Sequence, residues 1–184
     1  IDKRLGTVQP FAAFEWCEDS VLDWKRRKEL LKKRISKLCE QSDIVCFQEV
    51  EYNEKLEVPQ WLIEACGELK VAVVPSARDL DRNADRNERV LGVRHAVANL
   101  IVSRFEPIWY KAAATTQLSV AIENDFIIIN VHLDATVECK RLNTIFRAVA
   151  EARWHRGPTS RIVICGDWNA ELGPASVLGT LFSN

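Results

Sequence analysis

Apolar residues recur along the chain at two different spacings, and these spacings predict helices and strands in alternation. From residue 24 onward the apolar positions follow at steps of seven, four and three, namely Trp24, Leu31, Ile35 and Leu38. That spacing is typical of the buried face of an amphipathic helix. Two further helices are expected, at about 59–69 and about 137–154, and Gly157-Pro158 ends the second of these.

Short continuous apolar runs bounded by polar residues predict the strands. They cover residues 44–47, 71–74, 96–103, 118–122, 126–131 and 162–165. Only three residues separate the fourth run from the fifth, which indicates a hairpin. Residues 76–90 are highly charged and show no apolar period, so we expect a long surface loop there.

The mixed order of helices and strands favours a layered α/β domain in which helices cover the sheets. No glycine-rich turn follows any predicted strand, which argues against a doubly wound nucleotide-binding fold. The longest apolar run is about five residues, whereas a membrane-spanning helix needs ~20. A chain of 184 residues, 47% of them apolar, fits one globular domain.

Cysteine usage and local charge add to this picture. Six cysteines are spread over the chain without a Cys-x-x-Cys pair. This favours reduced, buried thiols, and hence an intracellular reducing compartment, over a disulfide framework or a zinc site. The net charge is −1, but residues 24–37 hold eight basic side chains and one acid. That helix presents either an ordinary solvated face or a surface that follows a phosphate backbone.

Polar side chains that can carry chemistry directly follow three of the predicted strands. They are Glu49, His132 and the pair Asp167 and Asn169. Each has an ordinary structural explanation: a carboxylate at the surface, a hydrogen-bonded histidine, or an Asx turn formed by the pair. Ligands of layered sheets bind outside strand ends, where the rigid backbone fixes side chains. The repeated placement therefore predicts one shared site.

These residue types favour a hard metal ion and phosphate chemistry. Mg²⁺ prefers one or two carboxylates and keeps several waters, which leaves positions for phosphate oxygens. Zinc fits less well because His132 has no second His or Cys at ligand spacing. The residues predict metal-assisted hydrolysis of a phosphate ester or a phosphodiester.

Four stretches of the sequence carry a family resemblance. They are DIVCFQEV at 43–50, ANLIVSRFEPI at 98–108, NVHLDA at 130–135 and ICGDWNAE at 164–171. In this order and spacing they resemble the endonuclease/exonuclease/phosphatase superfamily, the metal-dependent nucleases and phosphatases related to deoxyribonuclease I. The segment 24–46 resembles its deadenylase, nocturnin and 2′-5′ phosphodiesterase branch. The resemblance covers about residues 20–172 and implies a four-layer α/β sandwich with two packed mixed β-sheets flanked by helices.

The resemblance also implies a role for each residue of the predicted site. Glu49 would hold the catalytic metal ion, Mg²⁺ or alternatively Mn²⁺. Asp167 would orient or deprotonate the attacking water, and Asn169 would contact the scissile phosphate. His132 would also contact the substrate and stabilise the charge that develops on phosphorus. Two further polar residues lie near a strand that borders the cleft in relatives, and we expect both to be structural, namely His95 and Asn99.

The sequence departs from the family pattern at two places. The stretch around 5–14 has no Asn where family members carry one on their first strand, and no Ser-Asp-His motif follows GDWN. We therefore expect residues 1–184 to form a single, incomplete domain of this kind. Without those groups, metal binding would be weak and the nucleophile poorly activated.

The favoured function is Mg²⁺-dependent hydrolysis of RNA by a 3′ exoribonuclease or deadenylase-like enzyme. One alternative is a catalytically degenerate member that serves as a structural or RNA-binding subunit, with protein partners in a larger assembly. Another is a phosphatase or phosphodiesterase for a small phosphorylated molecule. The expected partner is RNA or another phosphodiester substrate.

Overall fold

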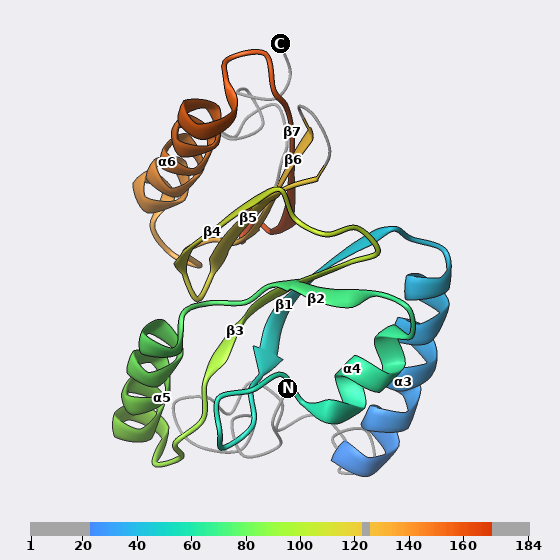
Figure 1. Cartoon of the computed structure of the whole chain (residues 1–184). Coiled ribbons are helices and arrows are strands. Elements are labelled where there is room, and N and C mark those ends of the chain that lie inside the picture. The colour runs from blue at the N-terminus through green and yellow to red at the C-terminus, as the bar shows by residue number, and fades with distance from the viewer. Residues whose placement is uncertain (1–22, 123–125, 171–184) are drawn as a thin grey trace.

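The computed structural model describes residues 23–122 and 126–170, and it contains two β-sheets with helices on their outer faces (Figure 1). The strands are β1 Ile44–Glu51, β2 Lys70–Val73, β3 Val97–Ser103, β4 Trp109–Ala114, β5 Gln117–Ala121, β6 Phe126–His132 and β7 Arg161–Asp167. The helices are α3 Trp24–Glu40, α4 Gln60–Cys66, α5 Ala77–Leu91 and α6 Glu138–Arg156. In the part of the chain that the structure describes, no helix is both long enough and apolar enough to cross a membrane.

The two sheets lie face to face inside the molecule. One has the strand order β1-β3-β2 and the other β4-β5-β6-β7. Apolar cores lie between the first sheet and α3, α4 and α5, between the second sheet and α6, and between the two sheets. Central strands are therefore buried on both faces, which explains their continuous apolar runs. The predicted four-layer α/β sandwich is confirmed.

Most strands lie where the apolar runs predict them. β5 and β6 pair antiparallel, as the predicted hairpin requires, while its connection at 123–125 lies outside the described residues. β6 and β7 are parallel neighbours joined through α6. The apolar pattern does not predict β4, because this strand lies at the edge of its sheet and is only partly buried.

The segment 76–90 forms α5, so the predicted surface loop is wrong. Ser76 caps the helix by accepting a hydrogen bond from a backbone N–H of the first turn at 3.2 Å. Gly92 ends the helix in the left-handed conformation. Leu80 and Ala84, about one turn apart, are both buried against the first sheet.

Two asparagines also lie on the inner face of α5, and they interrupt the helical spacing of its apolar residues. The Asn83 Oδ1 accepts a hydrogen bond from the Val97 N–H, and the Asn87 Nδ2 donates to the His95 carbonyl, both at 2.8 Å. These bonds fasten the helix to the start of β3. Because amides share the inner face with apolar residues, the spacing of apolar residues alone does not reveal the helix.

The predicted helix at residue 24 is present as α3, but its predicted buried face is wrong in part. Ile35 is buried as expected, together with Cys39 one turn later. The other three predicted positions are exposed, namely Trp24, Leu31 and Leu38. The Trp24 ring lies edge-on against the ring of Trp61, which belongs to α4, with ring centroids 5.7 Å apart. The helix thus packs through a narrower strip than its apolar stripe.

Candidate active site

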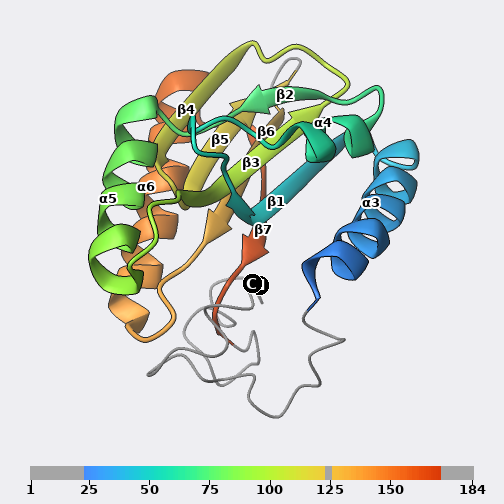
Figure 2. The same ribbon diagram turned by 90° about the horizontal axis from the view of Figure 1, so that it is seen from below.

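The C-terminal ends of β1, β6 and β7 point toward the same end of the molecule (Figure 2). β6 and β7 are neighbours in one sheet, and β1 contacts both of them across the interface between the sheets. Glu49 lies near the end of β1, and His132 and Asp167 are the last residues of β6 and β7. The sequence-predicted residues therefore come from two sheets that face each other.

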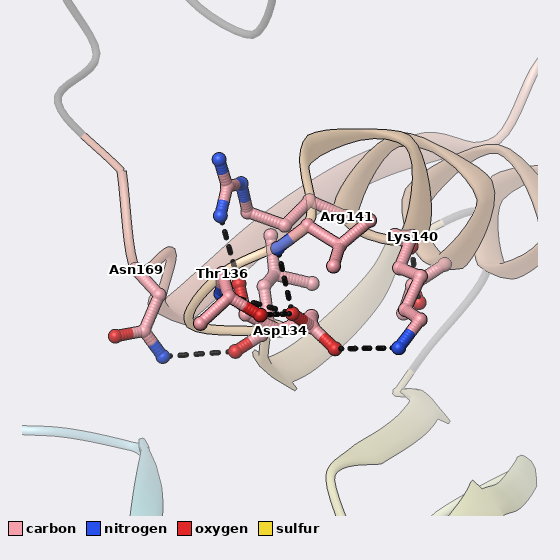
Figure 3. Close-up of polar contacts among 8 residues, drawn as sticks. Asp134, Thr136, Lys140, Arg141 and Asn169 are labelled. Atoms are coloured by element: carbon pink, nitrogen blue, oxygen red, sulfur yellow. Dashed lines mark hydrogen bonds and ion pairs between the residues drawn. The ribbon is translucent and has the colours of Figure 1, made fainter.

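The structure brings His132, Asp167 and Asn169 together at the end of the four-stranded sheet. His132 and Asp167 are register partners on β6 and β7, and the Leu133 N–H donates to the Asp167 carbonyl at 2.9 Å. The Asn169 Nδ2 donates to the Leu133 carbonyl at 2.8 Å (Figure 3). The loops that follow the two strands are thus joined by hydrogen bonds.

Asp167 and Asn169 also form the Asx turn that the sequence allows. The Asn169 N–H donates to the Asp167 Oδ1 at 2.9 Å, and Asn169 has a left-handed φ of 47°. Asparagine tolerates this conformation better than most residues. The turn uses only one carboxylate oxygen of the exposed Asp167, so the other oxygen can accept further hydrogen bonds.

Glu49 lies in a β-bulge of β1. The register with β3 shifts within residues 47–50, and Glu49 has a φ of 54°. Bulges re-aim side chains and are common beside functional sites, and Glu49 is exposed. No hydrogen bond or ion pair of the described residues joins Glu49 directly to His132, Asp167 or Asn169.

A buried amide network connects the residue before Glu49 to β6. The Gln48 Nε2 donates to the Asn130 Oδ1 at 2.7 Å. The Asn130 Nδ2 donates to the carbonyls of Phe47 and Leu100 at 3.0 and 3.1 Å. Asn130 is fully buried, so these bonds replace the water that its amide would otherwise need. They hold the end of β1 over β6.

The loop after β6 is fixed by Asp134. Its carboxylate accepts hydrogen bonds from the N–H groups of Thr136 and Val137 at 2.9 and 2.8 Å, and it contacts the Lys140 Nζ at 3.4 Å (Figure 3). These backbone donors hold the pKa of Asp134 well below its ordinary value. The loop that carries the Leu133 carbonyl is therefore anchored to the start of α6.

A pocket of about 530 Å³ begins two residues after Glu49. Its lining residues are Glu51, Tyr52, Asn53, Glu54, Lys55, Glu57, Val93, Arg94 and His95. Arg94 is held by acidic side chains of α5, including Asp85 at 3.2 Å. His95 is 7% exposed, and within the described ranges its Nδ1 has no hydrogen-bond partner. The strand-end pattern does not predict this pocket.

Comparison with known families agrees with the fold. The model of the endonuclease/exonuclease/phosphatase family matches residues 14–180. The chain belongs to this family. Its members are hydrolases of the nuclease, phosphodiesterase and phosphatase type, and they usually employ divalent metal ions.

Three solved structures share the fold. An endonuclease/exonuclease/phosphatase from Bacteroides vulgatus superposes with a TM-score of 0.57 at 19% identity, covering 88% of this chain and 64% of its own. A conserved protein of unknown function from Enterococcus faecalis V583 gives 0.57 at 18%, with coverages of 86% and 64%. A family protein from Leptotrichia buccalis C-1013-b gives 0.51 at 13%, with coverages of 85% and 63%.

The chain thus spans a little under two thirds of the length of these structures. At such low identities the likeness shows the fold alone. No curated protein matches the chain.

The donor set at the strand ends fits a hard divalent cation with few protein ligands. Over residues 23–122 and 126–170, no three His, Cys, Asp or Glu side chains gather closely enough to enclose an ion. Mg²⁺ does not need such a cage, since one or two carboxylates and several waters complete its shell. The exposed carboxylates of Glu49 and Asp167 are ligands of this type.

Strand-end reasoning finds the four predicted site residues but misses the two amides that support them, Gln48 and Asn130. Gln48 and Asn130 do carry a signal, because each interrupts or ends an apolar run with an amide, and a buried amide requires a partner. Asn99 is 1% exposed and donates to the Thr116 carbonyl at 3.1 Å, which agrees with its expected structural role.

Proposed function

We propose that this chain carries the active site of a Mg²⁺-dependent phosphodiesterase that shortens RNA from its 3′ end. The proposal places the chain in the deadenylase, nocturnin and 2′-5′ phosphodiesterase branch of its family. The observation that carries it is the common direction of β1, β6 and β7, which puts the ends that bear Glu49, His132 and Asp167 on one end of the molecule (Figure 2).

Asp167 is the proposed base for the attacking water. Its Oδ1 is held by the Asn169 N–H at 2.9 Å, which fixes the carboxylate while its second oxygen stays available. A positioned carboxylate of this kind can take the proton as water attacks phosphorus. The side chain of Asn169 is oriented by its bond to the Leu133 carbonyl, and its remaining N–H can donate to a phosphate oxygen.

His132 is the proposed donor to the charge that develops on phosphorus. Its backbone N–H is fixed by the Thr116 carbonyl at 2.9 Å, and its side chain is only partly buried. Donors that are positioned before the reaction stabilise such charge more effectively than water does.

Glu49 is the proposed metal ligand. A Mg²⁺ ion bound there would supply positive charge to the phosphate oxygens. The bulge fixes the Glu49 backbone through its left-handed φ, and the network from Gln48 to Asn130 fixes its neighbour.

The basic surface of α3 supports RNA as the substrate. The exposed basic side chains are Lys25, Arg26, Lys33, Arg34 and Lys37. Lys28 lies over the Trp61 ring at 5.8 Å from its centroid. Basic side chains beside aromatic rings are typical of surfaces that bind single-stranded nucleic acid. The helix begins at the end of the molecule toward which β1 and β7 point (Figure 2).

A cleavage assay tests this proposal. The chain is incubated with 5′-labelled oligoadenylate and Mg²⁺, and we expect products that shorten progressively from the 3′ end. Glu49→Gln and Asp167→Asn should each lower the rate by about 100-fold or more, whereas Glu106→Gln, an exposed acid on another loop, should not. Rates unchanged by the first two substitutions would exclude the mechanism.

The same assay separates the alternatives. Binding of the RNA without cleavage would favour a degenerate RNA-binding subunit, and release of phosphate from small phosphorylated molecules but not from RNA would favour a phosphatase. The single incomplete domain over 1–184, the reducing compartment and the protein partners stay predictions.

A further inference from the structure

Two cysteines lie between the sheets directly behind the candidate active site. Cys46 is on β1 and Cys165 is on β7, and both pack against the core between the sheets. Cys46 precedes Glu49 by three residues, and Cys165 precedes Asp167 by two. Within the described residues, β1 and β7 are edge strands of their sheets, and they contact each other.

Surrounding contacts hold the two thiols face to face. Asn130 is the register partner of Cys165, and its side chain donates to the carbonyl of Phe47, the residue after Cys46, at 3.0 Å. The Cys46 and Cys165 thiols lie within reach of each other, and the Cys165 Sγ also donates to the Ile129 carbonyl at 3.8 Å. Both cysteines are only partly buried, so a small oxidant can reach them.

A second thiol pair provides a comparison within the same molecule. Cys39 on α3 and Cys66 on α4 also lie within reach of each other, but they are only 4% and 2% exposed. Burial raises the pKa of both thiols, that of Cys66 to about 12. The thiolate is the reactive form, so this buried pair should react slowly with an oxidant. Cys46 and Cys165 are less buried.

We propose that Cys46 and Cys165 are a redox-active dithiol that a hydroperoxide closes to a disulfide between the two sheets, and that this disulfide weakens divalent-ion binding at the strand ends. The second half of the proposal rests on the proposed function. The first half rests only on the placement of the two thiols.

The reaction balances with one hydroperoxide for each disulfide. One of the two sulfurs attacks the terminal peroxide oxygen, the O–O bond breaks, and the alcohol or water leaves with the thiol proton. The sulfur of the other cysteine then attacks the sulfur of the resulting sulfenic acid, the S–O bond breaks, and water leaves with the second thiol proton. The two sulfurs lose two electrons, and the peroxide gains them.

We expect closure to move the strand ends. A disulfide bond is about 2.05 Å long, much shorter than a contact between two thiols, and forming it should draw β1 and β7 toward each other. Glu49 lies in the strained bulge just beyond Cys46. Metal sites require their ligands within about 0.5 Å of the binding geometry, so a shift at this position should weaken the site.

Disulfide mapping tests the thiol pair without any assay of function. The folded chain is treated with hydrogen peroxide, its remaining thiols are alkylated in denaturant, and the non-reduced digest is analysed by mass spectrometry. We expect a cross-linked peptide that joins Cys46 to Cys165, while Cys39 and Cys66 stay alkylated. Alkylation of both Cys46 and Cys165, or their pairing with other cysteines, would overturn the inference.

Mn²⁺ titration of reduced and oxidised protein tests the consequence. We expect at least tenfold weaker binding after oxidation, with recovery on addition of dithiothreitol. Cys165→Ser and, as a second variant, Cys46→Ala should bind Mn²⁺ equally well before and after peroxide, whereas Cys39→Ser should respond like the wild type. Equal affinity in the mapped, cross-linked wild type would contradict the regulatory half. If the reduced protein did not bind Mn²⁺, the proposed function would fail, and the disulfide map would still decide the thiol pair.

Discussion

Gly166 lies where a side chain on β7 would strike the backbone of β6. Its φ is 136°, and an added Cβ would lie 1.9 Å from the Val131 carbonyl oxygen. We expect Gly166→Ala to lower the free energy of unfolding by about 3 kcal/mol and to displace Asp167. Urea denaturation measures the loss.

Gly92 provides the matched control for that substitution. Its φ of 72° is also left-handed, but an added Cβ would meet nothing within 4 Å. Gly92→Ala should therefore cost only about 1 kcal/mol, the strain of the backbone conformation. Equal losses in the two variants would show that the close approach to Val131 does not matter.

At the scale of single residues, the sequence predicts the polar residues at the strand ends better than the hydrogen bonds that hold these strand ends in place. Asp167 and Asn169 directly follow an apolar run and form the Asx turn that their residue types allow. The bond from Gln48 to Asn130 joins residues 82 positions apart. Nothing local in the sequence specifies such a contact, because it depends on how the two sheets stack.

Among the elements, α5 is the helix that the apolar spacing fails to predict, because polar residues share its inner face. Asn83 fastens it to β3 by accepting the Val97 N–H. Asn83→Ala would leave that N–H unpaired at a cost of about 1.5 kcal/mol, and we expect the melting temperature to fall by about 4 °C. Arg82→Ala, an exposed neighbour on the same helix, should have little effect. Alanine is the best helix former, so a similar fall in both variants could not come from helix propensity and would show that the bond to Val97 does not stabilise the chain.

The free energy of unfolding should depend on pH at low pH, because Asp134 holds the loop before α6. Its pKa is lowered in the folded protein, whereas in the unfolded chain it returns to about 3.9. The contribution of Asp134 is therefore complete above about pH 4 and is lost as the pH falls toward the lower folded value.

Asp134→Asn should remove this part of the acid dependence. Urea midpoints measured between about pH 5 and pH 2 should fall more steeply for the wild type than for the variant. Glu29→Gln, at an exposed position of α3, is the control and should follow the wild type. Parallel curves for wild type and Asp134→Asn would show that the hydrogen bonds to Thr136 and Val137 do not anchor the loop.

For the whole molecule, the order of motifs predicts the four-layer sandwich, and apolar runs predict six of the seven strands that the described residues form. The pattern does not predict strand order or the stacking of β1 on β6 and β7, because these depend on contacts between distant segments. The pocket beside β1 is not predicted either, because its lining comes from two separate stretches of the chain.

We propose that the ends of β1, β6 and β7 form one divalent-ion site. Paramagnetic broadening of backbone amide signals by substoichiometric Mn²⁺ locates the ion, because broadening depends on distance to the ion and not on catalysis. We predict selective loss of signals at residues 48–50, 132–134 and 166–169 together, and their retention in Glu49→Gln. Broadening confined to one strand end, or located elsewhere on the molecule, would contradict the shared site.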